Sequence, residues 1–452
     1  MIERTEKNSN FGQFLRWWFF APFIDSFVDI MRLITITEVV LLMTFYGLSG
    51  AMTAEPSTFM AEEIWTTWKH HQEYDKEFDN VSLNTLEMIR RAGYPAEAHV
   101  VTTEDGYLLT LHRIPGSNNS LPILLQHGLL CSSADWVFLG KGKALAYLLA
   151  DQGYDVWLGN YRGNTYSRAH IHLSPSNLTF WDFSFHEMGI YDLPAMIKFI
   201  TTMRMQPLHT YIGHSMGTTG FYIMASESSE IAEKVRMMIS LAPAVFISHM
   251  KSPIKYLYPF WREYKNIMQS FFHDELLPQN NLLKFLTTYV CNQNVIEEKI
   301  CADLLFMVCG FDREQFNYTL IPFILGHDPA GTSSRTLLHF VQEYHSGKFR
   351  QYDYGWMKNL LKYKSLDPPD YKLASIKLPI ALFYGPGDWL VNVKDVKKLY
   401  SILPNVIDAY AVPWYKFNHG DFIWATNAPE LVYNRILKLM KPEDLNNVTL
   451  IG

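Results

Sequence analysis

LHTYIGHSMGTTGFYIMAS, residues 208–226, runs from an apolar strand-like segment through a small turn into a helical pattern. At its centre Ser215 lies between Gly213 and Gly217, in the order G-x-S-x-G. This order is typical of a tight strand–turn–helix elbow that exposes a serine hydroxyl at the edge of a parallel sheet. Because short patterns of this kind also arise by chance, the interpretation depends on what the rest of the chain supplies.

Apolar runs of strand length alternate with helical patterns along much of the chain. Continuous apolar strands that alternate with helices predict a mostly parallel sheet with helices on both faces, which is an α/β fold. The expected strands are 121–128, 154–160, 208–215, 235–245, 378–388 and 406–414, and the expected helices include 142–153, 192–203 and 218–229.

An antiparallel hairpin is expected before this sheet. Two strand-like runs, 98–103 and 107–114, are joined by the turn sequence EDG. Just upstream, a short helix is expected to be capped by Ser82 or Asn84 and to end at Gly93.

The alternation stops between about Phe246 and Lys372, where the chain is rich in aromatic residues, Leu and Met and lacks buried strand patterns. We interpret this segment as an insertion that covers the carboxyl ends of the strands. The predicted organisation is an N-terminal extension (1–54), the first part of the α/β core (55–245), a cap and lid insertion (246–372) and the second part of the core (373–452).

Three candidate catalytic side chains follow predicted strands, and ligands bind beyond the carboxyl ends of such strands. Ser215 is the candidate nucleophile, His419 the base that takes its proton, and Asp388 the carboxylate that orients the imidazole. Their order in the chain, Ser–Asp–His, is the one that the α/β-hydrolase arrangement requires. Asp421 lies past the histidine and is interpreted as a local orienter or a solvated group, and Asp395, in a helical pattern, is a weaker candidate.

Catalysis by a serine also needs N–H donors for the oxyanion of the tetrahedral intermediate. The expected donors are the backbone N–H groups of Met216, directly after the nucleophile, and Leu129, in the turn after an earlier strand. His127 is expected to stabilise that turn, and His214 to serve the elbow rather than act as the base.

Composition excludes several other classes of function. The 452 residues are 48% hydrophobic and 19% charged, with a net charge of −6, which does not fit a nucleic-acid-binding protein. The chain has no CxxC pair, HExxH motif or phosphate-binding loop, so neither a metal nor an organic cofactor is expected. The 15% aromatic content suits an apolar ligand, although a large core alone also explains it.

The N-terminal segment and the sequons indicate the secretory route. The apolar run Val39–Leu48 has the length of the apolar region of a secretory signal, with small residues after it; an uncleaved signal-anchor is the alternative. Sequons for N-glycosylation occur at Asn80, Asn118, Asn177, Asn317 and Asn447. An oxidising compartment would allow one local disulfide among the four cysteines, and four reduced thiols are the alternative.

Many ordered segments resemble the acid lipase family, which includes gastric lipase and lysosomal acid lipase. The resemblance runs from about Leu83 to Lys441. It rests on segments such as VTTEDGYLLTLHRIP, LQHGLL, DQGYDVWLGNYRGNTYSR, GHSMGTT, HDPAGTS and NHGDFIWA.

This resemblance implies an α/β-hydrolase fold with a cap and a lid, and hydrolysis of triacylglycerols or cholesteryl esters, often at acidic pH. Ser215, Asp388 and His419 fall on the family's triad positions, and Leu129 and Met216 on its oxyanion positions. Cys291 and Cys301 match the disulfide of the family's lid, which leaves Cys309 as a free thiol.

The chain departs from the family pattern at a few positions. Cys131 stands in the oxyanion turn where a small residue is usual, and Met216 replaces a common glutamine. Gly420 follows the histidine where leucine is common, and we expect it to loosen the support of that residue.

The sequence thus predicts a secreted or lysosomal serine lipase that acts through an acyl-enzyme on lipid esters at a droplet, micelle or membrane, without an obligate protein partner. One alternative is a carboxylesterase for small soluble esters. A second, from another class, is a catalytically silent lipid-binding protein on the same fold.

Overall fold

The computed structural model describes residues 83–441, apart from 261–265, 267, 271 and 279–294. The N-terminal extension predicted at 1–54 and the first residues of the predicted core lie outside these ranges. Within them, no helix combines the length and the apolar character that a bilayer crossing needs.

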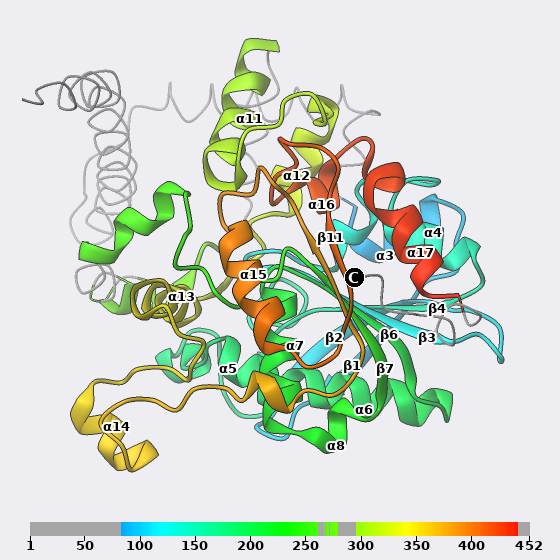
Figure 1. Cartoon of the computed structure of the whole chain (residues 1–452). Helices are drawn as coiled ribbons and strands as arrows, with labels where there is room; N and C mark the ends of the chain where they lie inside the picture. The colour runs from blue at the N-terminus through cyan, green and yellow to red at the C-terminus, as the bar shows by residue number, and fades with distance from the viewer. Residues whose placement is uncertain (1–82, 261–265, 267, 271, 279–294, 442–452) are drawn as a thin grey trace, which may run out of the picture. The chain divides into compact units, whose positions relative to one another are not determined.

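One large sheet organises the described chain (Figure 1), with the strand order β1-β2-β4-β3-β6-β7-β10-β11. β1, β2 and β4 pair antiparallel, and every neighbouring pair from β4 to β11 is parallel. The strands are β1 (Glu97–Thr102), β2 (Tyr107–Ile114), β3 (Pro122–Gln126), β4 (Asp155–Gly159), β6 (Leu208–His214), β7 (Val235–Leu241), β10 (Ile380–Tyr384) and β11 (Val406–Ala411), and the short β5 (Ala169–His170) pairs with β2. The mostly parallel sheet predicted from the apolar runs is therefore confirmed.

Burial of the strands follows from their place in the sheet. Every residue of β3, β4 and β6 is buried, because helices cover both faces of the centre and leave no face exposed to solvent. At the edge, β1 has exposed and partly buried residues in alternation along most of its length. Continuous apolar runs thus indicate the central strands, whereas alternation indicates the edge.

The covering helices begin close to the predicted positions. In Figure 1, α6 lies below the sheet, and α3, α4 and α17 lie above it. The main helices of the core are α3 (Thr85–Arg91), α4 (Leu145–Asp151), α6 (Leu193–Arg204), α7 (Met216–Glu227), α15 (Val393–Ile402) and α17 (Asn434–Leu439).

Local signals at the start of the described chain have the expected effect. The Asn84 side chain accepts a hydrogen bond from the Glu87 N–H, and the Glu87 carboxylate accepts one from the Asn84 N–H, which is a capping box that fixes the start of α3. Gly106 has a φ of 98°, which glycine adopts without strain, and completes the turn between β1 and β2. The predicted helix and hairpin are both confirmed.

Between β7 and β10 the chain forms a mainly helical segment. Its elements include the 3-10 helices η5 (Pro253–Phe260) and η6 (Tyr318–Leu320), the paired strands β8 (Glu275–Leu276) and β9 (Thr332–Ser333), and the helices α11 (Val295–Cys309), α12 (Ile321–His327), α13 (Ser334–Ser346) and α14 (Trp356–Tyr363). A separate apolar cluster joins this segment to the core: Phe306 and Ile324 belong to the same buried group as Ala134 and Phe138. The boundaries 246–372 of the cap remain a prediction.

A buried arginine links three parts of the core. The Arg162 side chain is 1% exposed and contacts Asp192 at 2.6 Å and Asp105 at 2.6 Å. Its guanidinium also lies over the ring of Tyr107, 4.0 Å from the centroid. Asp105 belongs to the β1–β2 turn and Asp192 directly precedes α6. Since a buried charge is costly without partners, this group ties the hairpin to the helical layer.

Candidate active site

Ser215 sits on a strained turn between β6 and α7. Its φ of 52° and ψ of −119° are unusual for a residue with a side chain, and such conformations cost about 1–3 kcal/mol. The neighbouring strand β7 supports this turn, because the Ser215 N–H donates to the Leu241 carbonyl at 3.0 Å. A side chain at Gly217 would come within 2.3 Å of the Gln126 carbonyl oxygen, so only glycine allows this close approach. The elbow geometry predicted from the motif is present.

Asp388 and His419 form a buried pair beyond β10 and β11. His419 Nδ1 donates to Asp388 Oδ2 at 2.8 Å. The other carboxylate oxygen accepts from the N–H groups of Leu390 and Val391, each at 2.8 Å. Three donors thus fix the carboxylate, and the carboxylate fixes the imidazole with its Nε2 free to accept a proton.

His214 connects the elbow to the loop of His419. Its Nε2 donates to the His419 carbonyl at 2.9 Å, and the two rings lie 5.0 Å apart. Burial lowers the pKa of His214 to about 3, so the ring stays neutral and serves as a brace. Within the described residues, the Ser215 hydroxyl is not hydrogen-bonded to the His419 ring. This contact is often long without a bound substrate.

The turn after β3 lies directly against the elbow. A side chain at Gly128 would contact Ser215 Cβ at 3.2 Å. Leu129 follows in this turn and is partly exposed. The N–H of Met216, in the first turn of α7, has no acceptor within its helix. The structure therefore brings the two predicted donor residues to the neighbourhood of the predicted nucleophile.

His127 holds this turn in place. Its Nε2 accepts hydrogen bonds from the Tyr161 N–H and the Asn164 amide, each at 3.1 Å, so Nδ1 carries the proton and donates to the Gly128 carbonyl at 2.8 Å. Burial lowers the pKa of His127 to about 4, which keeps this tautomer neutral. The interpretation of His127 as a stabiliser of the turn agrees with these contacts.

Asp421 is a buried orienter, and the alternative of a solvated group is wrong. The residue is 2% exposed, and its carboxyl accepts from the Asn418 N–H at 2.6 Å. It also contacts the carboxyl of Asp312, from the segment between β7 and β10. Burial, followed by the nearby Asp312, holds the pKa of Asp421 well above its usual range. Two carboxyl groups in contact are stable when they share a proton.

The same segment supports His419 through its backbone. The Cys309 carbonyl accepts from the N–H groups of His419 at 3.3 Å and Trp389 at 3.1 Å. That Gly420 loosens this loop stays a prediction, although the residue has close local contacts. Its N–H donates to Asn418 Oδ1 at 2.8 Å, and the Trp424 ring occupies the space where a side chain would lie.

We expect Asp421→Ala to destabilise the protein and to lower activity. The substitution leaves the buried Asn418 N–H without its acceptor, which costs about 1–3 kcal/mol in the free energy of unfolding. Asp421→Asn keeps an acceptor oxygen and is the matched control, with less than half of that loss. Urea unfolding measures both variants, and equal losses would contradict the role assigned to this contact.

Asp395 is no part of the candidate triad. It is buried in α15 and accepts hydrogen bonds from the backbone N–H and the ring of His249, each at 2.8 Å. The carboxylate thereby joins α15 to the chain that follows β7. This position agrees with its ranking as a weaker candidate.

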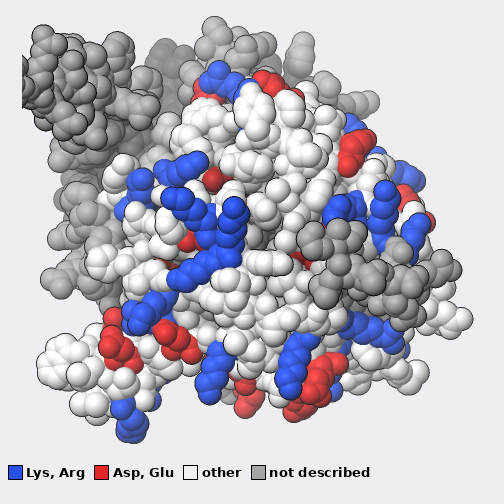
Figure 2. All heavy atoms as spheres, in the orientation of Figure 1, with Lys and Arg blue, Asp and Glu red and all other residues white. Residues whose placement is uncertain are grey.

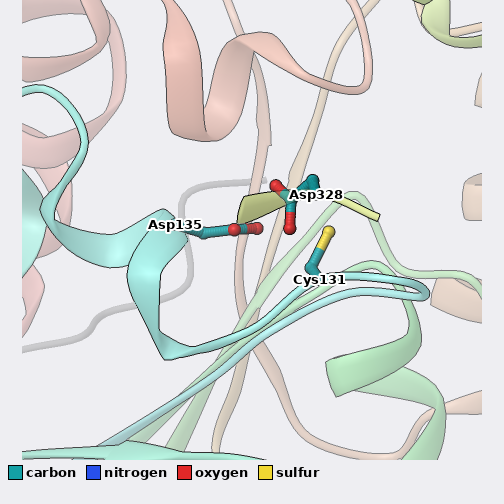
Figure 3. A group of neighbouring side chains, drawn as sticks. All are labelled: Cys131, Asp135 and Asp328. Atoms are coloured by element: carbon teal, nitrogen blue, oxygen red, sulfur yellow. The ribbon is translucent and has the colours of Figure 1, made fainter. Parts of the chain in front are cut away.

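A second carboxyl pair, unforeseen from the sequence, lies beside the turn after β3. Figure 3 shows the side chains of Cys131, Asp135 and Asp328 turned toward one another, and their potential ligand atoms all lie within 4.8 Å. Asp135 Oδ1 and both Asp328 oxygens are buried, with no hydrogen-bond donor in the described chain. A bound cation or a shared proton would relieve the repulsion between the two carboxylates. A shared proton is the simpler arrangement, because it needs no ligand beyond the two carboxyl groups.

Burial raises the pKa of Asp135 to about 6, and burial together with Asp135 raises that of Asp328 well above its usual range. Folding therefore favours the protonated forms, and their contribution to stability is complete below about pH 4 and declines as the pH rises through 6 and beyond.

We expect the double variant Asp135→Asn, Asp328→Asn to lose less stability between pH 5 and pH 8 than the wild type. Thermal unfolding of both proteins across this range makes the comparison. Parallel pH curves would rule out a shared proton at this pair. A bound metal would instead appear as a rise of the wild-type Tm at pH 8 with added Zn²⁺, absent from the double variant.

The cysteine and glycosylation predictions are only partly within the described ranges. Cys301 is disulfide-bonded, and Cys131 and Cys309 are free thiols. Cys291 lies outside the described residues, so its pairing with Cys301 stays a prediction. Asn118, Asn177 and Asn317 are exposed, whereas Asn80 and Asn447 lie outside the described residues.

The sheet order, the covering helices and the serine elbow define an α/β-hydrolase. Comparison with known families agrees with this class. A model described as the partial alpha/beta-hydrolase lipase region matches residues 85–140, and one described as the alpha/beta hydrolase fold matches 122–289.

Relatives with similar sequences are lipases. Lipase 3 of Drosophila melanogaster is 43% identical over 362 residues, which cover 78% of this chain and 92% of the relative. The gastric triacylglycerol lipase of Homo sapiens is 40% identical over 80% of this chain and 92% of its own. The lysosomal acid lipase/cholesteryl ester hydrolase of Homo sapiens is 39% identical over 80% and 91%. The chain belongs to the acid lipase family of carboxylic ester hydrolases.

Proposed function

We propose that Ser215, His419 and Asp388 form the catalytic triad of a lipase that cleaves triacylglycerols, cholesteryl esters or both. The observation that carries this proposal is the strained Ser215 elbow together with the Asp388–His419 hydrogen bond of 2.8 Å, all at the carboxyl ends of parallel strands. A serine on a strained turn and an imidazole oriented by a carboxylate are the two parts that acyl transfer needs.

In the first half of the reaction, His419 Nε2 takes the proton of Ser215 as its oxygen attacks the ester carbonyl. The oxyanion that forms is stabilised by the N–H groups of Leu129 and Met216, and loss of one such donor costs about 100- to 1000-fold in rate. The imidazolium, held by Asp388, then protonates the leaving alcohol and leaves an acyl-Ser215 ester.

In the second half, water takes the place of the alcohol. His419 accepts a proton from water, the hydroxide attacks the acyl carbonyl, and the same N–H groups stabilise the second oxyanion. The proton returns to Ser215 as the fatty acid leaves. Apart from the substrate and this water, each step uses only side chains and backbone groups of this chain.

An apolar surface near the site supports a lipid substrate. In the segment between β7 and β10, Leu304, Val308 and Phe311 are 50%, 36% and 40% exposed. Phe311 packs against Trp389, the residue next to Asp388, with ring centroids 5.4 Å apart. We assign residues 246–372 to a cap and lid that cover the site. The names of the relatives quoted above support the same substrate class.

The proposal extends to the compartment. The exposed sequons and the gastric and lysosomal relatives support a secreted or lysosomal enzyme, and an uncleaved N-terminal segment would anchor it to a membrane instead. N-terminal sequencing of the mature protein distinguishes these cases.

Rates measured across the solubility limit of a short-chain triacylglycerol test the substrate class. For a lipase we expect the rate to rise steeply once droplets form. A rate that saturates below the limit and stays flat above it would support the carboxylesterase alternative. No hydrolysis at either pH 5 or pH 7.5 would support the silent lipid-binding protein.

A further inference from the structure

The short helix α14 exposes a large apolar surface. Trp356, Met357, Leu360 and Leu361 are 63%, 61%, 47% and 73% exposed, and Leu366, just beyond the helix, is 60% exposed. In Figure 1 this helix projects at the lower left, and the same corner of the molecule in Figure 2 shows uncharged side chains at its outer edge, with acidic side chains above them and basic side chains below. Clusters of exposed large apolar side chains mark interaction sites in soluble proteins.

Helical geometry gathers these residues on one side. At about 100° per residue, Trp356, Leu360, Met357 and Leu361 follow one another around an arc of roughly 140°. Asn359 and Tyr363 lie on the adjoining arc, about 60° and 20° from Trp356, where Asn359 is buried and Tyr363 partly buried. The helix is therefore amphipathic with its apolar side turned outward, which is the reverse of a helix that covers a core.

Hydrogen bonds from the inner side of the helix fix its position against the surrounding loop. The Asn359 amide donates to Asp353 at 2.7 Å and to the Leu366 carbonyl at 2.9 Å, and its oxygen accepts from the Tyr354 N–H at 2.9 Å. The Tyr363 hydroxyl donates to the Tyr352 carbonyl at 2.8 Å. The outward apolar side is thus a fixed feature of the fold, presented by the segment between Asp353 and Leu366.

The charges on the helix itself have one sign, and two exposed acids, Asp353 and Asp367, flank it. Lys358, Lys362 and Lys364 are exposed, and no acidic residue occurs from 354 to 366. The flanking acids have other partners, since Asp353 accepts from the Gly355 N–H and Asp367 pairs with Arg350. In the part of the chain that the structure describes, none of the three lysines forms an ion pair. Lys362 donates to the Tyr354 hydroxyl and Lys364 to a backbone carbonyl.

We infer that α14 docks the protein on an anionic lipid surface, with Trp356, Met357, Leu360 and Leu361 inserted at the boundary of the acyl chains and the lysines against the headgroups. A short amphipathic helix with lysines beside a Trp- and Leu-rich side is the pattern that binds such surfaces. Charge complementarity favours anionic lipid over a second copy of this chain, whose own α14 would bring three like charges into contact.

Vesicle flotation tests this inference. We expect the wild-type protein to bind vesicles of phosphatidylcholine and phosphatidylserine, to bind pure phosphatidylcholine less, and to be released by salt. Trp356→Glu with Leu361→Glu should weaken binding to the mixed vesicles by about 10-fold or more, since two inserted side chains become charged. Met205→Glu is the matched control, because Met205 is 92% exposed and lies outside α14.

Hydrolysis of a water-soluble ester separates this inference from the proposed catalytic function. The α14 variant should keep wild-type turnover of such an ester, because neither substituted residue belongs to the catalytic machinery. If the α14 variant bound vesicles as strongly as the wild-type protein, the inference would be overturned, whether or not catalysis is intact. The inference would also be overturned if the wild-type protein formed a concentration-dependent dimer and the α14 variant did not. That result would assign the surface to a second copy of the chain.

Discussion

Replacing Ser215 with alanine is expected to reduce kcat for ester hydrolysis by about 10⁴- to 10⁶-fold. The hydroxyl is the only group on the elbow that can form the acyl-enzyme, and neither His419 nor the oxyanion donors can take its place. The residual rate reflects binding and oxyanion stabilisation alone. Initial rates on a soluble p-nitrophenyl ester measure the loss without interference from an interface.

Ser226→Ala is the matched control, because Ser226 lies on the same helix and its hydroxyl only donates to the Ile223 carbonyl at 2.9 Å. It should retain wild-type activity. The Ser215 variant should also unfold at no lower temperature than the wild type, since the strain is in the backbone and the hydroxyl contributes no packing. Activity within 10-fold of the wild type in Ser215→Ala would contradict the assignment of the nucleophile.

Replacing Arg162 with methionine is expected to lower the free energy of unfolding by about 3–5 kcal/mol. The side chain is 1% exposed, and its removal leaves the buried Asp192 without its cationic partner and Asp105 without both of its guanidinium contacts. Because the total stability of a protein is only about 5–15 kcal/mol, this loss would remove a large share of it.

Arg435→Met provides the comparison. Arg435 also pairs with a carboxylate, Asp408, at 2.7 Å, but its side chain is 46% exposed. Solvent screens such a pair, so the loss should stay below about 1 kcal/mol. Urea unfolding at pH 7 measures both variants. Equal effects would show that burial does not set the strength of the Arg162 group.

Local patterns in the sequence predicted most of the core. The mostly apolar runs at 122–126, 155–159 and 208–214 became fully buried central strands, because near-continuous apolar runs that alternate with helices fit a parallel sheet covered on both faces. The G-x-S-x-G order predicted the Ser215 turn, since the glycines permit close approaches that any larger residue would block.

Long-range pairing of charged side chains could not be predicted in this way. Asp135 and Asp328 are far apart in the sequence, and each alone looks like an ordinary surface residue. Only the packing of α12 beside the turn after β3 brings them together. The solvated alternative for Asp421 failed for the same reason, because its partner Asp312 comes from a segment more than a hundred residues earlier.

The sequence predicts the helical periodicity of α14 but not that its apolar side faces outward. The run WMKNLLKY has helical periodicity, but periodicity alone does not say which side of a helix faces the core. The inward side is set by Asn359, a polar residue that satisfies three partners from the surrounding loop. A pattern search for apolar residues assigns the opposite orientation.

Peptide mapping of the wild-type protein after reaction with a fluorophosphonate tests the central claim most directly. We expect one equivalent of adduct, located by mass spectrometry on the peptide that contains Ser215, and formation of this adduct in parallel with the loss of esterase activity. An intact Ser215 peptide after complete inactivation, with the adduct on another residue, would contradict the proposed site.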